Sequence, residues 1–287
     1  FEYEFIFIDG NSKDKTLNKL KKHLIGFSHK YKILVNKDGT TPKSLNKGIN
    51  NSDGDYILRM DGHSIYPKNY ILSLIKNQKR YNCENIGGIV KTVPKNNSLI
   101  SHAIAAAMSS GFCVGPSKFR ISESSKNKKI ISVDTVPFGC FKKTIFKKIG
   151  LFNEKLLRNQ DDEFNSRIIT NGGEILLDKS LVIKYEGRET FSKLFITFFQ
   201  YGLYKPLAAI IAGKIYTLRQ LIPLFSFLVL LLLISSTFFY SFSIFLVLSL
   251  IISYIILSFV FGFKSLKSKS FKNLKKICTF QILFLLS

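Results

Sequence analysis

The chain has 287 residues, which is enough for one large domain or two small ones with a hydrophobic core. Its 42 basic and 19 acidic side chains leave a formal net charge of +23, which favours anionic partners such as nucleic acid, phospholipid or sugar nucleotides. The four cysteines are far apart and form no CxxC pair, which argues against a zinc knuckle or a disulfide framework.

The first 190 residues have a pattern of strands alternating with helices. We expect strands at 1–9, 31–35 and 55–61, and helices at 13–24, 41–50 and 67–79. Such alternation predicts a mostly parallel sheet with helices on both faces. Asp9 and Asp61 end two of these strands, so we expect them to share one crevice at the carboxyl edge of the sheet.

The pattern then loosens from about residue 95 to 130 into a stretch rich in Gly, Ser and Lys, which we expect to be a mobile basic loop. Order returns in the segment NEKLLRNQDDEFNSRIITNGG, where Asp161 and Asp162 stand at a predicted helix N-terminus. Residues 190–213 are apolar and aromatic with few charges, as is typical of helices at a membrane surface.

Residues 221–263 contain no charged side chain. Forty-three residues suit two helices of about 20 residues, each crossing a bilayer core of about 30 Å. Basic residues flank the pair on both sides, so the positive-inside tendency places both flanks in the cytoplasm. The alternative is a buried hairpin in a soluble core, which the length and the lack of charge disfavour.

Asp61 and His63 are two residues apart at the end of a predicted strand, where both side chains can face a divalent cation. Carboxylate suits Mg²⁺ or Mn²⁺, and imidazole tilts the choice toward Mn²⁺. Ordinary turn chemistry is an equal alternative, because Asp-Gly favours turns and the chain has four such pairs.

The two acids at 161 and 162 also have two interpretations. Carboxylates at a helix start interact favourably with the helix dipole, which is the usual explanation. One of them can instead be a general base if it faces the crevice, since clustered carboxylates raise the pKa of at least one member.

In this order the motifs resemble those of the family 2 glycosyltransferases with the GT-A fold, in the membrane-attached branch that includes the succinoglycan glucosyltransferase. IDGNSKDKT at 8–16 is similar to the family's VDGGSTDGT. SLNKGINNSDGDYILRMDGHS at 44–64 resembles the approach to its metal motif, and VPFGCFKKTIFKKIGLFNEKLLRNQDDEFNSRI at 136–168 resembles the stretch with the catalytic acid.

By position, the resemblance implies that Asp9 contacts the base or ribose of a nucleotide and that Asp61 and His63 hold Mg²⁺ or Mn²⁺ on the donor diphosphate. It implies Asp162 as the catalytic base. Further substrate contacts are implied for Lys47, Arg120, Asp161 and Gln200. QYGLY at 200–204 resembles the QxxRW motif of processive members, with Leu and Tyr in place of Arg and Trp.

The resemblance implies a GT-A catalytic domain over residues 1–190, built as a Rossmann-like mixed sheet flanked by helices. Interfacial amphipathic helices are expected at 191–220 and two transmembrane helices at 221–263. A basic cytoplasmic segment and the start of a third apolar helix are expected at 264–287. The chain begins at Phe1, directly in a strand, so we expect it to be a fragment that lacks the family's first strand and helix.

The implied function is inverting sugar transfer from a nucleoside diphosphate sugar to a hydroxyl of a lipid-linked or polysaccharide acceptor. The protein would be an integral membrane enzyme of a bacterial inner membrane, with its catalytic domain in the cytoplasm. One alternative is a non-catalytic membrane protein that keeps the fold as a partner-binding module. A nucleic-acid partner is not expected, because no recognisable binding module is present.

Overall fold

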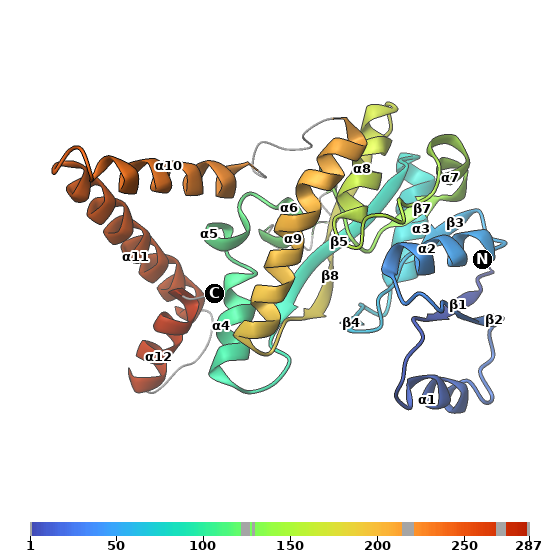
Figure 1. Ribbon diagram of the computed structural model, residues 1–287. Helices are drawn as coiled ribbons and strands as arrows, with labels where there is room; N and C mark the ends of the chain where they lie inside the picture. The colour runs from blue at the N-terminus through green and yellow to red at the C-terminus, as the bar shows by residue number, and fades with distance from the viewer. Residues whose placement is uncertain (1, 122–126, 128–129, 214–220, 268–273, 286–287) are drawn as a thin grey trace.

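The computed structural model describes residues 2–121, 127, 130–213, 221–267 and 274–285 (Figure 1). At the N-terminus, β1 (Phe5–Asp9) and β2 (Tyr31–Val35) pair in parallel as a two-stranded sheet, with α1 (Thr16–His23) between them in the chain. The next helix, α2 (Thr41–Asn50), packs on β1 so closely that a Cβ at Gly48 would lie 2.7 Å from the Ile8 side chain.

A second sheet of six strands forms the centre of the molecule, in the order β3-β7-β5-β8-β4 with β6 also paired to β8. Its strands are β3 (Tyr56–Leu58), β4 (Ser64–Ile65), β5 (Asn85–Val93), β6 (Ile130–Ser132), β7 (Cys140–Lys142) and β8 (Ile175–Glu186). Only β5 and β8 pair in parallel in this sheet, and its other four pairings are antiparallel.

The mixed sheet flanked by helices is therefore confirmed, but the expectation of a mostly parallel sheet is wrong. Strand–helix alternation predicts parallel pairing only where each helix returns the chain to the same edge. Here the chain passes from β3 through a tight turn to β4, which pairs antiparallel with β8 at the far side of the sheet. The first two strands form a sheet of their own.

The expected mobile loop is also wrong over residues 99–121, because three helices occupy it. These are α4 (Leu99–Ala107), α5 (Gly111–Val114) and α6 (Lys118–Ile121). Six of the nine residues of α4 are buried, and its N-cap Ser98 accepts a hydrogen bond from the backbone N–H of Ser101 at 3.1 Å. Small side chains let this helix pack tightly. Composition alone does not distinguish such a helix from a loop, because both are rich in small residues.

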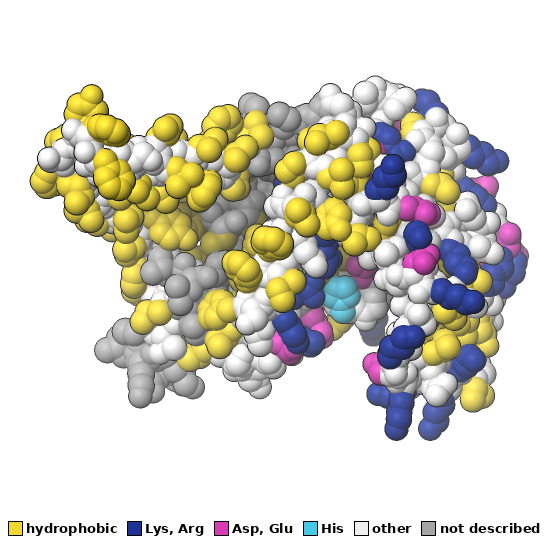
Figure 2. All heavy atoms as spheres, viewed as in Figure 1, with side chains coloured by type: hydrophobic (Ala, Val, Ile, Leu, Met, Phe, Trp, Pro, Cys, Tyr) yellow, Lys and Arg dark blue, Asp and Glu magenta, His cyan; other side chains and the backbone are white. Residues whose placement is uncertain are grey.

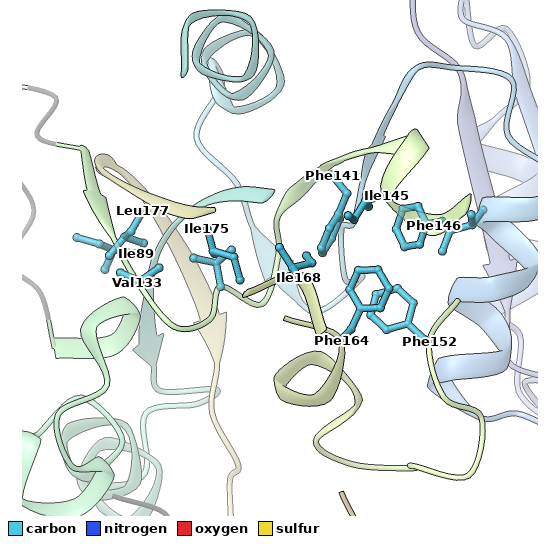
Figure 3. Close-up of a cluster of buried hydrophobic side chains, with 12 residues drawn as sticks. Ile89, Val133, Phe141, Ile145, Phe146, Phe152, Phe164, Ile168, Ile175 and Leu177 are labelled. Carbon is cyan, nitrogen blue, oxygen red and sulfur yellow. The ribbon is translucent and has the colours of Figure 1, made fainter. Parts of the chain in front are cut away.

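Further helices are α3 (Tyr70–Tyr81), α7 (Lys143–Ile149) and α8 (Gln160–Thr170). An aromatic cluster holds α8 in place (Figure 3). The Phe164 ring centroid lies 4.5 Å from that of Phe152, 5.0 Å from that of Phe146 and 5.7 Å from that of Phe141. Phe164 is fully buried, and Ile168 continues the same face of the helix into the core. This packing sets where the N-terminus of α8 lies.

A buried amide network holds the segment before β7. Asn85 Nδ2 donates to Asn165 Oδ1 at 2.9 Å, and Asn165 Nδ2 donates to Thr135 Oγ1 at 2.8 Å. Gly139 closes over this network, and a Cβ there would lie only 1.9 Å from Asn85 Oδ1. Buried amides are costly unless paired, so the network specifies one position for this segment.

Among the described residues after Glu189, the helices are α9 (Phe191–Ala212), α10 (Ile222–Ser236), α11 (Ser243–Lys267) and α12 (Leu274–Leu285). By length and composition, α9 and residues Ser243–Leu266 of α11 are long and apolar enough to cross a membrane. The charge-free stretch thus contains the 15-residue helix α10 and most of the 25-residue helix α11, which continues past it to Lys267, and one helix of 22 residues precedes it. Figure 2 shows hydrophobic side chains over much of α10 and α11.

The apolar helices α11 and α12 attach to the six-stranded sheet through α4. Phe280 and Phe284 of α12 and Leu266 of α11 pack against three alanines of α4, Ala103, Ala106 and Ala107. On its other side α4 contacts β5. The segment expected to be a loop is therefore the structural link between the sheet and the apolar helices.

Replacing Gly139 by Ala tests the packing of the amide network. We expect Gly139→Ala to lower the free energy of unfolding by about 1–3 kcal/mol, because the new methyl group overlaps Asn85. Thermal unfolding in detergent, followed by circular dichroism, measures the change. Gly54→Ala is the matched control, since a Cβ there meets only the carbonyl oxygen of Tyr56 at 3.5 Å. Equal melting temperatures for the two variants would contradict this packing.

Candidate active site

The guanidinium of Arg59 joins two of the predicted site acids. Arg59 follows β3, and its side chain is only 9% exposed. Its Nε and Nη2 atoms donate to the two carboxylate oxygens of Asp61 at 3.2 and 3.3 Å, and its Nη1 atom lies 3.0 Å from Asp161 Oδ1. Residues about 100 positions apart in the chain are thereby brought together at the end of β3 and the start of α8.

Arg59 is held from behind by the segment that carries Gly139. Its backbone N–H donates to the Gly139 carbonyl oxygen at 3.1 Å, and its guanidinium carbon lies 5.6 Å from the centroid of the Phe138 ring. Burial lowers the pKa of Arg59, but the Asp161 and Asp61 carboxylates outweigh that effect and the pKa is raised overall. The group therefore stays charged, as an arginine does in proteins.

Sequence reasoning missed Arg59. The available signal was an arginine inside the apolar run YILRM, since a buried charge requires a partner of opposite sign. Tyr66 was missed as well: its hydroxyl oxygen accepts a hydrogen bond from the backbone N–H of Asp61 at 2.7 Å. Burial raises the pKa of Tyr66 to about 12, so this phenol stays neutral at physiological pH.

The three acids in the first turn of α8 have three different partners. Asp161 faces Arg59, and Glu163 pairs with Arg167 one turn along the helix at 2.7 Å. The Oδ2 atom of Asp162 lies 3.9 Å from Lys205 Nζ on α9, and the Asp162 side chain is 25% exposed. All three acids also interact favourably with the N-terminal end of the helix dipole.

The helix α9 lies against the start of α8 through polar contacts. Gln200 accepts a hydrogen bond at its Oε1 atom from Arg158 Nε at 3.0 Å. One residue further along both segments, Asn159 Nδ2 donates to the Tyr201 carbonyl oxygen at 3.4 Å. The predicted substrate-binding Gln200 is thus placed beside the N-terminus of α8, next to the loop that leads to Asp162.

His63 lies in the turn between β3 and β4 and is exposed. Its ring centroid is 4.7 Å from that of Tyr185 in an edge-on contact. Burial raises the pKa of Tyr185, and the charges of Arg188, Asp61 and Arg120 also act on this phenol. Tyr185 therefore lies within electrostatic range of basic and acidic side chains, and sequence reasoning did not identify it.

The two arginines near Tyr185 are themselves tethered. Arg120 Nη1 donates to Thr92 Oγ1 at 3.4 Å, and Arg188 Nε donates to Thr197 Oγ1 at 3.0 Å. Figure 2 shows a hollow between the unit of β1, β2 and α1 and the rest of the molecule, with a histidine and charged side chains on its wall.

Asp9 ends β1, and Lys47 lies on α2, which packs on β1. The buried Asp9 carboxylate accepts hydrogen bonds from Ser12 Oγ at 2.6 Å and from Ser12 N–H at 3.0 Å. These hydrogen bonds, the hydroxyl first, lower the pKa of Asp9. Lys47 Nζ donates to the Val35 carbonyl oxygen at 2.6 Å. The contacts of Arg59 join Asp61 to Asp161. That Asp9 lies in the same cleft stays a prediction.

The donor set at the end of β3 fits a divalent cation that shares its coordination with a substrate. Asp61 supplies a carboxylate that is 26% exposed, and His63 supplies an exposed imidazole from the same turn. Among the described residues, no group of three or more His, Cys, Asp or Glu side chains could hold a metal ion by itself. Magnesium sites commonly use one or two carboxylates and complete the shell with substrate phosphates and water.

Comparison with known proteins adds an independent observation. Residues 1–150 match the model of the family described as "Glycosyl transferase family 2". A Methanococcus voltae protein named dolichyl N-acetyl-alpha-D-glucosaminyl phosphate 3-beta-D-2,3-diacetamido-2,3-dideoxy-beta-D-glucuronosyltransferase is 27% identical over 214 residues, 71% of this chain. The succinoglycan biosynthesis protein ExoA of Rhizobium meliloti (strain 1021) is 23% identical over 226 residues, 76% of this chain. The matches span 64% of the length of each relative.

Solved structures with a similar chain path include S. aureus TarS 1–349 in complex with UDP-GlcNAc. Its TM-score is 0.49 at 15% identity, over 66% of this chain and 51% of that chain. GalNAc-T7 with UDP, GalNAc and Mn²⁺ has a TM-score of 0.49 at 12% identity, over 64% of this chain and 38% of that chain.

Removing the Ser12 hydroxyl tests the environment of Asp9. We expect Ser12→Ala to raise the pKa of Asp9 toward its usual value, because the stronger of the two hydrogen bonds to its ionised form is lost. Carboxyl-carbon NMR titration of selectively labelled protein measures the shift. The folded pKa of Asp9 is depressed, so its contribution to stability is present above the unfolded pKa and is lost as pH falls through the folded pKa.

The matched control for this titration is Ser73→Ala, whose hydroxyl accepts only from Asn69 on the exposed start of α3. Its Asp9 titration should superimpose on that of the unmodified protein. An Asp9 pKa that does not respond to Ser12→Ala would contradict the hydrogen bonding described here.

Proposed function

The chain belongs to glycosyl transferase family 2, and we propose that it is an inverting glycosyltransferase of surface polysaccharide synthesis. It would move a sugar from a nucleoside diphosphate sugar to a hydroxyl of a lipid-linked acceptor. The names of the two relatives support this class of reaction, since one contains a dolichyl-linked sugar phosphate and the other names succinoglycan biosynthesis. The observation that carries the proposal is the buried Arg59, which holds Asp61 beside the acidic start of α8.

The donor end of the site would lie at the turn after β3. Asp61 and His63 would hold Mg²⁺ or Mn²⁺ there, and such an ion supplies Lewis-acid neutralisation of the charge on the departing diphosphate. Arg120 and Arg188, both near Tyr185, would add positive charge for the phosphates. Arginine suits this task because its planar guanidinium matches phosphate oxygens.

Asp162 is the best-placed general base among the three acids of α8. Asp161 is engaged by Arg59, and Glu163 is 3% exposed and paired with Arg167. Asp162 is 25% exposed, against 3% for Glu163, and its carboxylate lies 3.9 Å from Lys205 of α9, the helix along which we expect the acceptor to arrive. Asp162 would take the proton of the acceptor hydroxyl while the hydroxyl oxygen attacks the anomeric carbon. The bond between the anomeric carbon and the diphosphate would break on the opposite side.

The position of α9 suggests how a lipid-linked acceptor reaches the base. Its inner face makes polar contacts to the catalytic part through Gln200, Tyr201 and Lys205. Its outer face exposes large apolar side chains, namely Phe195, Ile196, Phe199, Leu203 and Ile210. A helix with one polar and one apolar side is suited to lie along a bilayer surface. We infer that α9 lies flat on the membrane and that α11, whose segment Ser243–Leu266 is long and apolar enough to cross a bilayer, enters it.

The test of the base is Asp162→Asn in membranes that contain the protein, assayed with a panel of radiolabelled sugar nucleotides. We expect transfer to fall by about 10²–10⁴-fold, because a positioned base contributes that much, while donor binding is retained. Asp53→Asn is the matched control: this exposed acid pairs with Lys30 and Lys32 in the N-terminal unit and should leave transfer unchanged. Near-normal transfer by Asp162→Asn would reject Asp162 as the base, and donor binding without transfer in the unmodified protein would favour a non-catalytic role.

A flat α9 predicts that both of its ends face the same compartment. Cysteines introduced at Lys193 and at Ala212 should both react with a membrane-impermeant maleimide in inside-out vesicles, and neither should react in right-side-out vesicles. The unmodified protein gives the labelling of its native thiols for subtraction. Reaction of the two positions from opposite sides would show that α9 crosses the bilayer.

A further inference from the structure

Arg59 occupies both carboxylate oxygens of Asp61. Its Nε and Nη2 atoms form a two-pronged contact at 3.2 and 3.3 Å, and a carboxylate held in this way presents its lone pairs to the guanidinium. The same oxygens are the ones that a divalent cation would bind in the proposed function. Arg59 and the cation therefore compete for Asp61.

The competition is electrostatic as well as steric. A guanidinium and a divalent cation on one carboxylate would sit a few ångströms apart in a site where Arg59 is 9% exposed. Like charges at that separation repel each other even in water, and more strongly in a partly buried site. The Asp61 contact of Arg59 is therefore weakened when the cation binds.

Arg59 has a second partner on which it can remain. Its Nη1 atom lies 3.0 Å from Asp161 Oδ1 at the start of α8. The Phe138 ring lies against its guanidinium, and the Gly139 carbonyl oxygen accepts a hydrogen bond from its backbone N–H. Asp161 immediately precedes Asp162, the proposed base. A guanidinium released from Asp61 can concentrate its charge on Asp161 without moving its backbone.

We propose that Arg59 is a positioning residue: it pairs with both Asp61 and Asp161 until a divalent cation takes Asp61, and it then concentrates its charge on Asp161 and with it on the N-terminus of α8. Loading of the donor end thus fixes the helix that carries the base. The inference rests on the proposed function, because that function supplies the cation and the role of Asp162.

The experiment measures binding of Mn²⁺ alone to the full chain in detergent, by loss of the free-ion EPR signal, with no nucleotide present. We expect Arg59→Met to bind Mn²⁺ about tenfold or more tightly, since the competing charge is gone. The same variant should lose sugar transfer, because α8 loses its anchor. Tighter Mn²⁺ binding together with a lower kcat distinguishes this role from simple loss of structure, because unfolding would weaken Mn²⁺ binding and lower kcat at the same time.

Four further variants serve as controls. Arg167→Met removes another partly buried guanidinium, one that pairs with Glu163 and binds the carbonyls of Ile149 and Leu151, and should leave Mn²⁺ affinity unchanged. The double variant Arg59→Met with Asp61→Asn should bind Mn²⁺ no more tightly than the single variant Asp61→Asn. If Arg59→Met does not fold, Asp161→Asn gives the opposite sign: with its second partner removed, Arg59 holds Asp61 more firmly and Mn²⁺ binding weakens.

Mn²⁺ affinity that is equal or lower in Arg59→Met, or undetectable in every protein, overturns the inference. Transfer that persists in EDTA with undetectable Mn²⁺ binding would overturn it while leaving sugar transfer intact. Absence of transfer from all donors, together with tighter Mn²⁺ binding by Arg59→Met, would instead support the inference and reject the proposed function.

Discussion

A buried positive charge must be paired, and in this protein that requirement organises the site. Arg59 is removed from water at the end of the edge strand β3, and it is paired with Asp61 in its own turn and with Asp161 at the start of α8. Losing both contacts would leave the charge of Arg59 unpaired in a poorly solvated place, which costs several kcal/mol. The donor and acceptor ends of the proposed site are therefore linked through one side chain.

Two buried assemblies hold that side chain and its partners in register. The phenylalanine cluster around Phe164 seats α8 from below, and the amide network of Asn85, Asn165 and Thr135 fixes the segment that carries Phe138. Phe138 in turn lies against the guanidinium of Arg59. Residues that never meet a substrate thus set the geometry of those proposed to do so.

Packing contacts also connect the sheet to the apolar helices. Alanines of α4 admit the phenylalanines of α12, and the other side of α4 touches the sheet. On the opposite flank α9 presents polar groups to α8 and phenylalanines outward. The proposed base therefore lies beneath a helix with one polar and one apolar side, which is where an acceptor held by a lipid anchor would arrive.

The sequence by itself determined the family, the mixed α/β class and the charge-free apolar stretch, because these depend on local motifs and composition. Asp61, Asp161 and Asp162 could be singled out because an acid at a strand or helix end is visible in one dimension. Only the tertiary structure decided that β1 and β2 form a separate sheet, that the supposed loop at 99–107 is a buried helix, and that Arg59 joins Asp61 to Asp161. Strand partners, burial of small residues and the partner of a buried charge all depend on segments distant in the chain, and no local pattern encodes which distant segment will be the neighbour.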